Sequence, residues 1–538
     1  MQILRCFICG FGCAVLLAAV PLVAAPHVAG VYNAASWVVP HQTNSGIAQG
    51  SLFTVTGTGL GPTTIQHADS YPLPTTEGLA GTTIQVRVNG VIQNCIMIYS
   101  LATQVAAILP SATPRGAGTL TLSYQGAESS IAIQVIAANF GTFALNEDGT
   151  GPGVFTDASN NPITYVHPAH PGEELVLWGT GLGAITGDET EPPQQVDLHS
   201  GVQVLVNNQP ATVVYGGRGS SAGVDQINFV VPAAVTGCKA SVAVIVKGVT
   251  GNITSMAVAP EGQATCGDTF GPLTADNLQK AVAKGSLNLG GVVVSRVAGG
   301  NDKLEASFAT YSLSNLVRSW GGGSAGSIGS CLAYETLGAS LKPIDPVVEN
   351  FLNSGSQLVL SSTGGSKTIA ALGTGLYDTT LASEPAEYIQ PGPFSITNGA
   401  GGTGVGSFNW SLTLPDPVVP TNIPASINLS EDLTLTWTGS SGFSVVSIFM
   451  FSGVPVSSET AYVEILCTAD ASTRSFTIPS AVLNVLSRSG YDAFGKPGVD
   501  IQIAGVPLVR YVDVPGSPGL DAGIFSVFVS NGGVARIQ

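Results

Sequence analysis

A chain of 538 residues is long enough for three or four domains, each with its own hydrophobic core. Apolar residues make up 44% of the chain, which excludes an intrinsically disordered protein, whereas only 10% of the residues are charged. The formal net charge is −16 and no segment gathers Lys or Arg into a cluster, which excludes a surface built to bind nucleic acid.

The N-terminal segment has the pattern of a secretory signal peptide. Arg5 supplies a positive charge, residues 6–20 form an apolar core, and Val23-Ala24-Ala25 offers a small-residue cleavage site. An uncleaved membrane anchor is the alternative, because the apolar run approaches the ~20 residues that span a bilayer. We expect residues 1–25 to be removed and the protein to be exported to the cell surface or the extracellular space. No membrane span is expected in the rest of the chain.

A glycine-rich pentapeptide occurs twice and reveals an internal repeat. Gly57-Thr58-Gly59-Leu60-Gly61 returns as Gly179-Thr180-Gly181-Leu182-Gly183, a shift of 122 residues that other landmarks share. We expect all six glycines to form structural turns. Short alternating segments between turn residues predict one β-sandwich in each copy, over residues 30–137 and 138–266. The expected strands are 52–56, 84–90 and 120–124 in the first copy, and 174–178, 202–208 and 242–246 in the second.

Several motifs follow one another in the same order in both copies: a strand, Gly-Thr-Gly-Leu-Gly, an alternating hairpin segment, and a Gln-Val or Gln-Ile strand that leads to a proline. This order resembles the IPT/TIG branch of immunoglobulin-like domains. A fuller set of motifs comprises Tyr32-Asn33-Ala34-Ala35-Ser36, Gly46-Ile47-Ala48-Gln49-Gly50-Ser51, Leu73-Pro74-Thr75-Thr76 and Gly151-Pro152-Gly153-Val154-Phe155-Thr156. This set resembles the Solibacter-type family of uncharacterised secreted proteins of acidobacteria. The resemblance covers residues 30–266 and implies tandem sandwiches that serve as interaction surfaces or spacers. Cys95 departs from the pattern, because a small or apolar residue is usual there.

A segment of different composition follows the repeats. Residues 274–284 predict a short helix, with Thr274 as its N-cap and Gly285 as its stop, and residues 320–326 predict a glycine-rich loop. We interpret residues 267–345 as a connector and residues 346–538 as a C-terminal β-rich domain. The predicted fold class is therefore all-β: tandem immunoglobulin-like β-sandwiches plus a C-terminal β-sandwich region, joined by a short helical connector. The C-terminal strands are expected at 357–361, 394–397 and 433–437.

Five cysteines remain after the signal peptide, and no Cys-x-x-Cys pair is among them. Cys238 and Cys266 bracket one expected hairpin, which predicts a disulfide bond in an oxidising compartment. By elimination, Cys331 is a candidate partner of Cys467. Cys95 lies in an apolar run, so we expect a buried free thiol there rather than a nucleophile.

Motifs that could carry catalysis have ordinary structural alternatives. The first pentapeptide lacks the helix that a dinucleotide-binding glycine loop needs. Ser221 and Ser324 lie in Gly-x-Ser-x-Gly matches, but all six histidines lie at or before His199, so neither serine has the downstream histidine of a hydrolase. We therefore expect no catalytic residue and no cofactor.

Polar loop residues could offer metal ligands. His167-Pro168-Ala169-His170 has no identifiable carboxylate partner, and we interpret it as a turn between the repeats. Residues 146–149 and 188–191 offer oxygen atoms of the kind that calcium prefers, but neither has EF-hand spacing, so solvated loops are expected and no metal site is predicted. A carboxylate pair for glycoside hydrolysis cannot be placed from sequence and stays open.

Tryptophans are the remaining candidates for ligand contact. Trp178 and Trp437 lie in phase with apolar strand neighbours and are expected in cores, whereas Trp320, beside a glycine-rich loop, is a candidate ligand contact. The favoured function is an exported non-catalytic binding or structural protein, with extracellular polysaccharides or surface proteins as its partners. Two alternatives stay open: a polymer-degrading enzyme with its active site after residue 346, and a self-assembling component of a surface layer or fibre.

Overall fold

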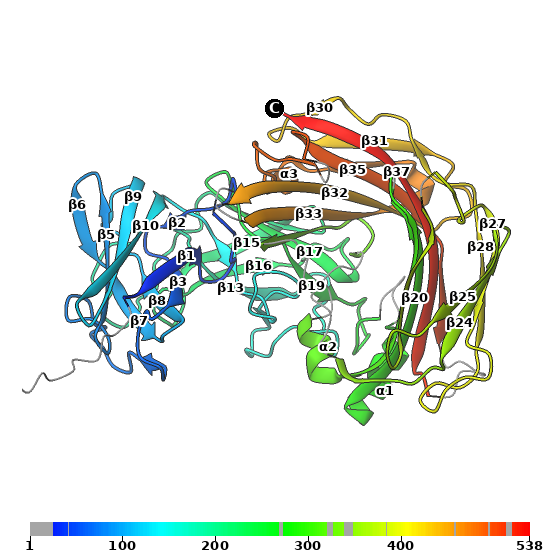
Figure 1. The fold of residues 1–538 in the computed structure, drawn as a ribbon. Helices are drawn as coiled ribbons and strands as arrows, with labels where there is room; N and C mark the ends of the chain where they lie inside the picture. The colour runs from blue at the N-terminus through cyan, green and yellow to red at the C-terminus, as the bar shows by residue number, and fades with distance from the viewer. Residues whose placement is uncertain are drawn as a thin grey trace, which may run out of the picture.

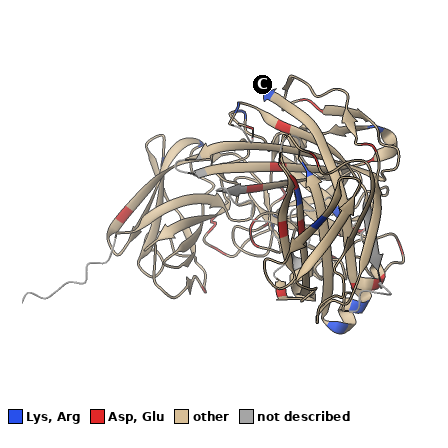
Figure 2. Cartoon of the chain, turned by 45° about the vertical axis from the view of Figure 1, so that its right-hand side comes forward, with Lys and Arg blue, Asp and Glu red and all other residues tan. Residues whose placement is uncertain are grey.

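The chain is built mainly from β-strands (Figure 1). The computed structural model describes residues 25–538, apart from 41, 268–272, 298, 320–325, 338–347, 384, 457–458, 493–494 and 513–518. Trp320, Ser324 and all but the last residue of the predicted signal peptide lie outside the described residues. The fold class is all-β, as expected. No described helix is long and apolar enough to cross a membrane, and charged residues lie scattered over the described chain (Figure 2).

The first repeat is a sandwich of two five-stranded sheets. Inward-facing side chains of both sheets, among them Phe53 and Leu122, form one hydrophobic core. Alternation along each strand decides which side chains enter this core: in β5 (Thr82–Val88), every second residue is buried. One sheet has the order β1 (His27–Asn33), β3 (Leu52–Thr58), β8 (Gln104–Ile108), β7 (Ile96–Ser100), β4 (Gln66–His67). The other has the order β2 (Ile47–Ala48), β10 (Ala127–Ile136), β9 (Gly116–Tyr124), β5, β6 (Val91–Asn94).

The second repeat has its own core, but its two halves are hydrogen-bonded into one sheet through β15 (Gln209–Arg218). A register shift between Val213 and Tyr215 lets β15 pair with β14 (Val202–Val206) near one end and with β16 (Asp225–Val230) along its length. The remaining strands are β11 (Gly141–Thr142), β12 (Phe155–Thr156), β13 (Glu174–Thr180), β17 (Gly237–Val246), β18 (Val249–Thr250) and β19 (Thr254–Val258).

Trp178 does not lie in the core of the second repeat. Strand β13 buries Leu175 and Leu177, so Trp178 points to the opposite face and is only partly buried. Its indole Nε1 donates a hydrogen bond to Thr156 Oγ1 at 3.0 Å. The expectation of a core position was wrong for Trp178, whereas Trp437 is buried as expected.

The two glycine pentapeptides begin inside strands. Gly59 and Gly181 have φ of +66° and +112°, and they turn the chain after β3 and β13. Gly57 and Gly179 instead belong to these strands, so the prediction of a turn is wrong for both. A Cβ atom on Gly57 would lie 1.9 Å from the His27 carbonyl oxygen of β1, so the close strand approach requires glycine.

The predicted helix is present as α1 (Ala275–Lys284). The Thr274 side chain accepts a hydrogen bond from the Asn277 N–H, and Gly285 ends the helix with φ of +79°. The rest of segment 267–345 is not a connector, and the boundary at residue 346 does not match the sheets. Strands β20 (Ser286–Arg296), β21 (Asp302–Ser312) and β22 (Cys331–Leu337) belong to the largest sheet, and α2 (Leu313–Ser319) lies between β21 and β22.

The largest sheet has eleven strands and is organised around one long strand, β37 (Ala522–Ile537). Residues 522–529 of β37 run parallel to β20, and residues 530–535 run antiparallel to β35 (Val499–Val506). Because β37 takes part in both halves, the sheet bends along it and forms the arch in Figure 1. The other strands are β23 (Val348–Phe351), β26 (Leu376–Ala382), β30 (Ser426–Ile427), β32 (Val445–Val456), β33 (Glu459–Asp470) and β36 (Leu508–Val512).

Two smaller sheets complete the C-terminal part, and one hydrophobic core includes residues of all three sheets. The rings of Phe408 and Trp410 stack in this core at 4.3 Å, with Phe308 of β21 beside them. The four-stranded sheet, called here the outer sheet, has the order β25 (Gly365–Ala370), β24 (Gln357–Ser362), β27 (Gly392–Thr397), β28 (Asn409–Leu414). The three-stranded sheet has β29 (Val419–Pro420), β31 (Leu433–Thr438) and β34 (Ser475–Ile478), and the short helices are η1 (Ala471–Thr473) and α3 (Ser480–Leu483).

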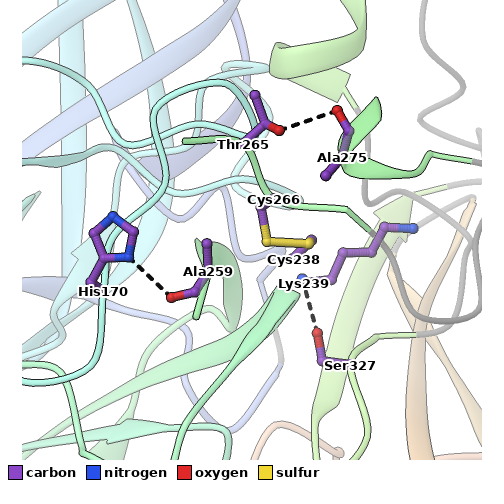
Figure 3. The surroundings of a disulfide bond; sticks show 8 residues. All are labelled: His170, Cys238, Lys239, Ala259, Thr265, Cys266, Ala275 and Ser327. Carbon is purple, nitrogen blue, oxygen red and sulfur yellow. Dashed lines mark hydrogen bonds between the residues drawn. A yellow bond between two sulfur atoms is a disulfide. The ribbon is translucent and has the colours of Figure 1, made fainter. Parts of the chain in front are cut away.

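Both predicted cysteine pairs are bonded. Cys238 and Cys266 join the start of β17 to the chain beyond β19, and the neighbouring Thr265 hydroxyl donates to the Ala275 carbonyl of α1 (Figure 3). Cys331 and Cys467 are direct partners on β22 and β33. Cys95 is a buried free thiol, and burial raises its pKa. A thiol with a raised pKa is a poor nucleophile, in agreement with a structural role.

Candidate functional site

The histidine pair of the sequence is not brought together around a metal position. His167 Nε2 lies 3.2 Å from the Asp157 carboxylate, whereas His170 Nδ1 lies 3.2 Å from the Ala259 carbonyl oxygen (Figure 3). Hydrogen bonds, chiefly from Asn161, lower the pKa of Asp157 to about 2. The described part of the chain holds no cluster of three His, Cys, Asp or Glu side chains suited to a metal.

The acidic loop residues order their own backbone. Asp148 accepts hydrogen bonds from the N–H and the hydroxyl of Thr150, both at 2.9 Å. Asp188 does the same for Thr190, at 2.9 and 2.6 Å. These contacts of Asp148 and Asp188 are the side chain-to-backbone hydrogen bonds typical of tight turns.

Ser221 lies in a hairpin loop, not at a nucleophile elbow. The loop joins β15 to β16, and it closes with hydrogen bonds from Val224 N–H to the Ser221 carbonyl and from Gly219 N–H to the Val224 carbonyl. A hydrolase elbow requires a strand that turns directly into a helix, and no helix follows here.

A buried ion pair holds the two repeats together. The Arg218 guanidinium pairs with Asp225, donates to the Gly183 carbonyl at 2.9 Å, and reaches across to the Gly50 carbonyl of the first repeat at 3.0 Å. Asp225 also accepts two N–H groups of the second pentapeptide at 2.8 Å each. Burial acts to raise the pKa of Asp225, while the guanidinium and these N–H groups act to lower it. Charge-assisted bonds of this kind fix geometry as well as adding energy.

A cavity of about 210 Å³ lies beside this ion pair, between the repeats. Its wall includes Arg218 and the acidic side chains of Asp188, Glu189 and Glu191. The Glu189 carboxylate accepts two hydrogen bonds from Ser111 of the first repeat, one from the Ser111 N–H at 2.6 Å and one from the Ser111 hydroxyl at 2.9 Å. Arg218 and Glu189 of the cavity wall bond to Gly50 and Ser111 of the first repeat, so the contacts around the cavity form a joint between the two repeats.

A second buried carboxyl lies where the first repeat meets the largest sheet. Glu335 of β22 accepts a hydrogen bond from Asn44 Nδ2 at 3.3 Å and another from the Val39 N–H, and burial raises its pKa to about 7. Asn139, which follows the first repeat, donates to the Asn44 carbonyl at 2.8 Å. Among the described residues, Glu335 Oε2 and both side-chain atoms of Gln42 have no hydrogen-bond partner. The junction is therefore sensitive to the charge of Glu335.

An open groove runs over the exposed face of the outer sheet, with a volume of about 600 Å³. Strand β24 pairs with β27 over only three residues, from Val359 to Ser361, whereas β27 pairs with β28 over six. The groove lies where β24 has stopped pairing with β27. Its lining, called here the hydroxyl groove, contains no Asp, Glu, Lys or Arg: Ser361, Ser362, Thr363, Pro393, Phe394, Ser395, Ser411, Leu412 and Thr413.

A row of serines crosses all four strands of the outer sheet. Ser366, Ser361, Ser395 and Ser411 are successive cross-strand partners on β25, β24, β27 and β28. Directly opposite residues share one face, so four hydroxyls lie in line at the strand spacing of about 4.8 Å. The sequence places each serine at a polar position of its own strand. The alignment of the four serines depends on which residues pair across the strands, and this register cannot be predicted from the sequence.

Two carboxylates share one row of the largest sheet. Glu464 of β33 and Asp500 of β35 are both cross-strand partners of Phe451 on β32, so all three side chains face the same side. Two strand spacings place the backbones of the acids about 10 Å apart. Burial raises the pKa of both carboxyls, and the Phe451 ring stacks on Tyr462 at 5.2 Å. Sequence spacing gave no sign of this arrangement.

Comparisons with known proteins add no family. No protein-family model and no curated protein matches the chain. Among solved structures, the extracellular region of plexin A4 is 16% identical with a TM-score of 0.16, and the match covers 42% of this chain and 18% of that one. The tetra-tandem repeat of a large adhesion protein is 13% identical, with coverages of 95% and 100% and a TM-score of 0.13. A Bacteroides ovatus glucan-utilisation protein, SGBP-B, is 9% identical, with coverages of 84% and 97% and a TM-score of 0.14. Similarity this low carries no conclusion about function.

Proposed function

We propose that this chain is an exported protein of the cell surface or extracellular space that acts without catalysis, as a rigid binding or structural module. The observation that carries the proposal is the joint between the repeats, where Arg218 and Glu189 tie two separate cores to each other. A bonded joint of this kind keeps the loops and faces of successive modules at fixed spacing, which suits presentation to a partner.

The bonded cysteines support the extracellular location. Disulfide bonds persist in oxidising compartments and are rare in the cytosol, and four of the five described cysteines are bonded. The low charge content and the N-terminal apolar segment point to the same compartment. We further propose membership of the Solibacter-type secreted family with IPT/TIG domains, on the ordered motifs of residues 30–266. Polysaccharides or surface proteins are the proposed partners.

The carboxylate row supports a second candidate, an enzyme that cleaves extracellular polysaccharides. Inverting glycosidases hold two carboxyl groups about 6.5–9.5 Å apart and raise the pKa of the general acid. The backbones of Glu464 and Asp500 lie about 10 Å apart with both side chains on one face, and burial raises the pKa of both carboxyls, as the role of general acid requires of one of them. Their aromatic neighbours Phe451 and Tyr462 would supply a surface for a sugar ring.

An exposed edge strand supports a third candidate, self-assembly into a layer or fibre. Strand β6 is the outermost strand of its sheet, and Val91 and Ile92 on it are 43% and 44% exposed. An unpaired apolar edge can add a strand from another chain. Val91→Lys would then abolish assembly while leaving the fold intact.

One experiment separates the three candidates. Purified residues 26–538 are incubated with insoluble plant, fungal and bacterial polysaccharides, with and without calcium, and both bound protein and released soluble sugar are measured. Saturable binding without sugar release supports the binding module. Sugar release that Glu464→Gln abolishes supports the enzyme. Concentration-dependent particles in the absence of polymer support self-assembly, and a protein that remains monomeric and binds no polymer leaves surface proteins as the partners.

A further inference from the structure

We propose that the hydroxyl groove of the outer sheet is a binding site for a neutral, unbranched polysaccharide chain. The inference deepens the proposed binding function and rests on it. It names the face that binds and the chemical class of polymer that this face selects.

The first reason is the charge of the groove. Its lining contains hydroxyl, proline and hydrocarbon groups and no ionisable side chain. A polyanion or a polycation would lose its hydration there without gaining a charged partner, which is a costly exchange. A neutral polymer avoids this cost, so the uncharged groove is expected to favour neutral polymers over charged ones.

The second reason is the arrangement of hydroxyls. Ser361, Ser395 and Ser411 follow one another across three strands, and Thr413 lies two residues beyond Ser411 on the same face of β28. Ser361 already shares a hydrogen bond with Ser366 at 3.3 Å, but a hydroxyl can donate one hydrogen bond and accept others, so the row keeps capacity to meet sugar hydroxyls. A row at the strand spacing of about 4.8 Å presents such groups at intervals similar to the length of one sugar unit in an extended chain.

The third reason is the stiffness of the groove floor. Phe394 and Leu412 line the groove while they remain buried in the core, and Phe394 is only 1% exposed. Beneath the same sheet, Trp410 stacks on Phe408. Hydroxyls carried by strands with packed inner faces lose little freedom on binding, and this preorganisation favours affinity.

The lining of the groove offers no exposed aromatic ring on which a sugar could stack, so each sugar unit is expected to bind weakly. Each hydroxyl contact replaces a hydrogen bond to water, so a single short oligosaccharide gains little. Several contacts along one insoluble chain add through high effective concentration. We therefore expect saturable binding to insoluble neutral polymer and weak binding to a short soluble oligosaccharide.

The test uses depletion of residues 26–538 by insoluble β-glucan, mannan and xylan, with chitosan and polygalacturonate as charged polymers. Ser411→Arg places a long cation in the groove, and Ser395→Val removes one hydroxyl with a side chain that suits a strand. Thr434→Arg is the matched control, because Thr434 is an exposed strand residue on the three-stranded sheet. We expect Ser411→Arg to weaken binding to the neutral polymer at least tenfold, Ser395→Val to weaken it severalfold, and Thr434→Arg to leave it unchanged.

The outcomes distinguish failure of the site from failure of the function. If the wild-type protein binds a neutral polymer and both groove variants bind equally well, the hydroxyl groove is not the site, although the binding function stands. Binding to charged polymers alone overturns the inference in the same way. If the wild-type protein binds no polymer, polysaccharide recognition fails altogether, and the groove proposal falls with it. Circular dichroism of each variant shows whether the sheets are intact.

Discussion

Replacing Glu335 by glutamine should remove a dependence of stability on pH. Burial raises the pKa of Glu335 from its ordinary value of 4.5 to about 7 at the junction between the first repeat and the largest sheet. The folded chain therefore binds this proton more tightly than the unfolded chain does. The contribution of Glu335 to stability is therefore most favourable below about pH 4.5, falls as the pH rises toward 7, and is constant above that value.

The magnitude follows from the shift in proton affinity. Each tenfold change in affinity corresponds to ~1.4 kcal/mol, so the rise of the Glu335 pKa to about 7 sets an upper limit of about 3 kcal/mol. Glu335 is half-buried as a residue although its Oε2 atom is enclosed, and screening by the surrounding medium reduces the effect to roughly 2 kcal/mol. Glu335→Gln keeps the shape and the Asn44 contact but cannot ionise. It should match the wild type at pH 4.5 and exceed it by roughly 2 kcal/mol at pH 7.5.

The measurement is urea unfolding from pH 4.5 to 7.5, followed by tryptophan fluorescence, to which buried Trp410 and Trp437 contribute from the C-terminal core. Glu431→Gln, at an exposed position, is the control, and its unfolding free energy should follow that of the wild type at every pH. Parallel curves for the wild type and Glu335→Gln over the whole pH range would refute the reasoning. The charge of Glu335 would then be solvated in the folded protein.

Three further perturbations test other contacts. Arg218→Met leaves Asp225 buried without its cation and should lower the free energy of unfolding by about 3–5 kcal/mol, read as a lower melting temperature. Replacing both Cys331 and Cys467 by serine removes a crosslink with a sequence separation of 136 and should cost about 5 kcal/mol in denaturant unfolding. Thr274→Ala removes the N-cap of α1 and should cost about 1 kcal/mol, seen as faster amide exchange in that helix.

Each of these expectations has a contrary result. Asp197→Asn breaks an exposed contact with His199 and should not change the melting temperature. If Arg218→Met lowers the melting temperature no more than this control does, the buried ion pair does not stabilise the fold. The Cys238–Cys266 bond spans only 28 residues, and its removal should cost less than removal of the longer crosslink. Unchanged amide exchange in α1 would show that packing, not the cap, holds the helix.

Local patterns predicted local structure well. The alternating segments at 84–90 and 202–208 lie in or around β5 and β14, because burial of one sheet face leaves a period of two in a single strand. The helix α1 begins after Thr274 and ends at Gly285, because capping depends on residues within one turn. The two disulfide bonds followed from hairpin position and from the small number of cysteines left to pair.

Long-range pairing could not be predicted from the sequence. Strand β20 pairs with β37 more than two hundred residues later, and the glycine pair Gly290-Gly291 interrupts its apolar alternation. For this reason residues 286–296 are interpreted from the sequence as part of a connector instead of a strand. Trp178 was misplaced because its neighbours Val176 and Leu177 are both apolar, and only the sheet decides which face is buried. The serine row and the pair of Glu464 with Asp500 likewise exist only through strand register.

The position of β37 determines the order in which the C-terminal part can fold. Among the described strands, β20 and β35 are joined through residues 522–535 of β37, so a growing chain leaves both with an unpaired edge until those residues are made. Loop closure over such a distance is slow, and the exposed edges invite pairing with other chains in the meantime. A chain that loses this strand would leave β20 and β35 each with an unpaired edge, and the two halves of the largest sheet would no longer share a strand.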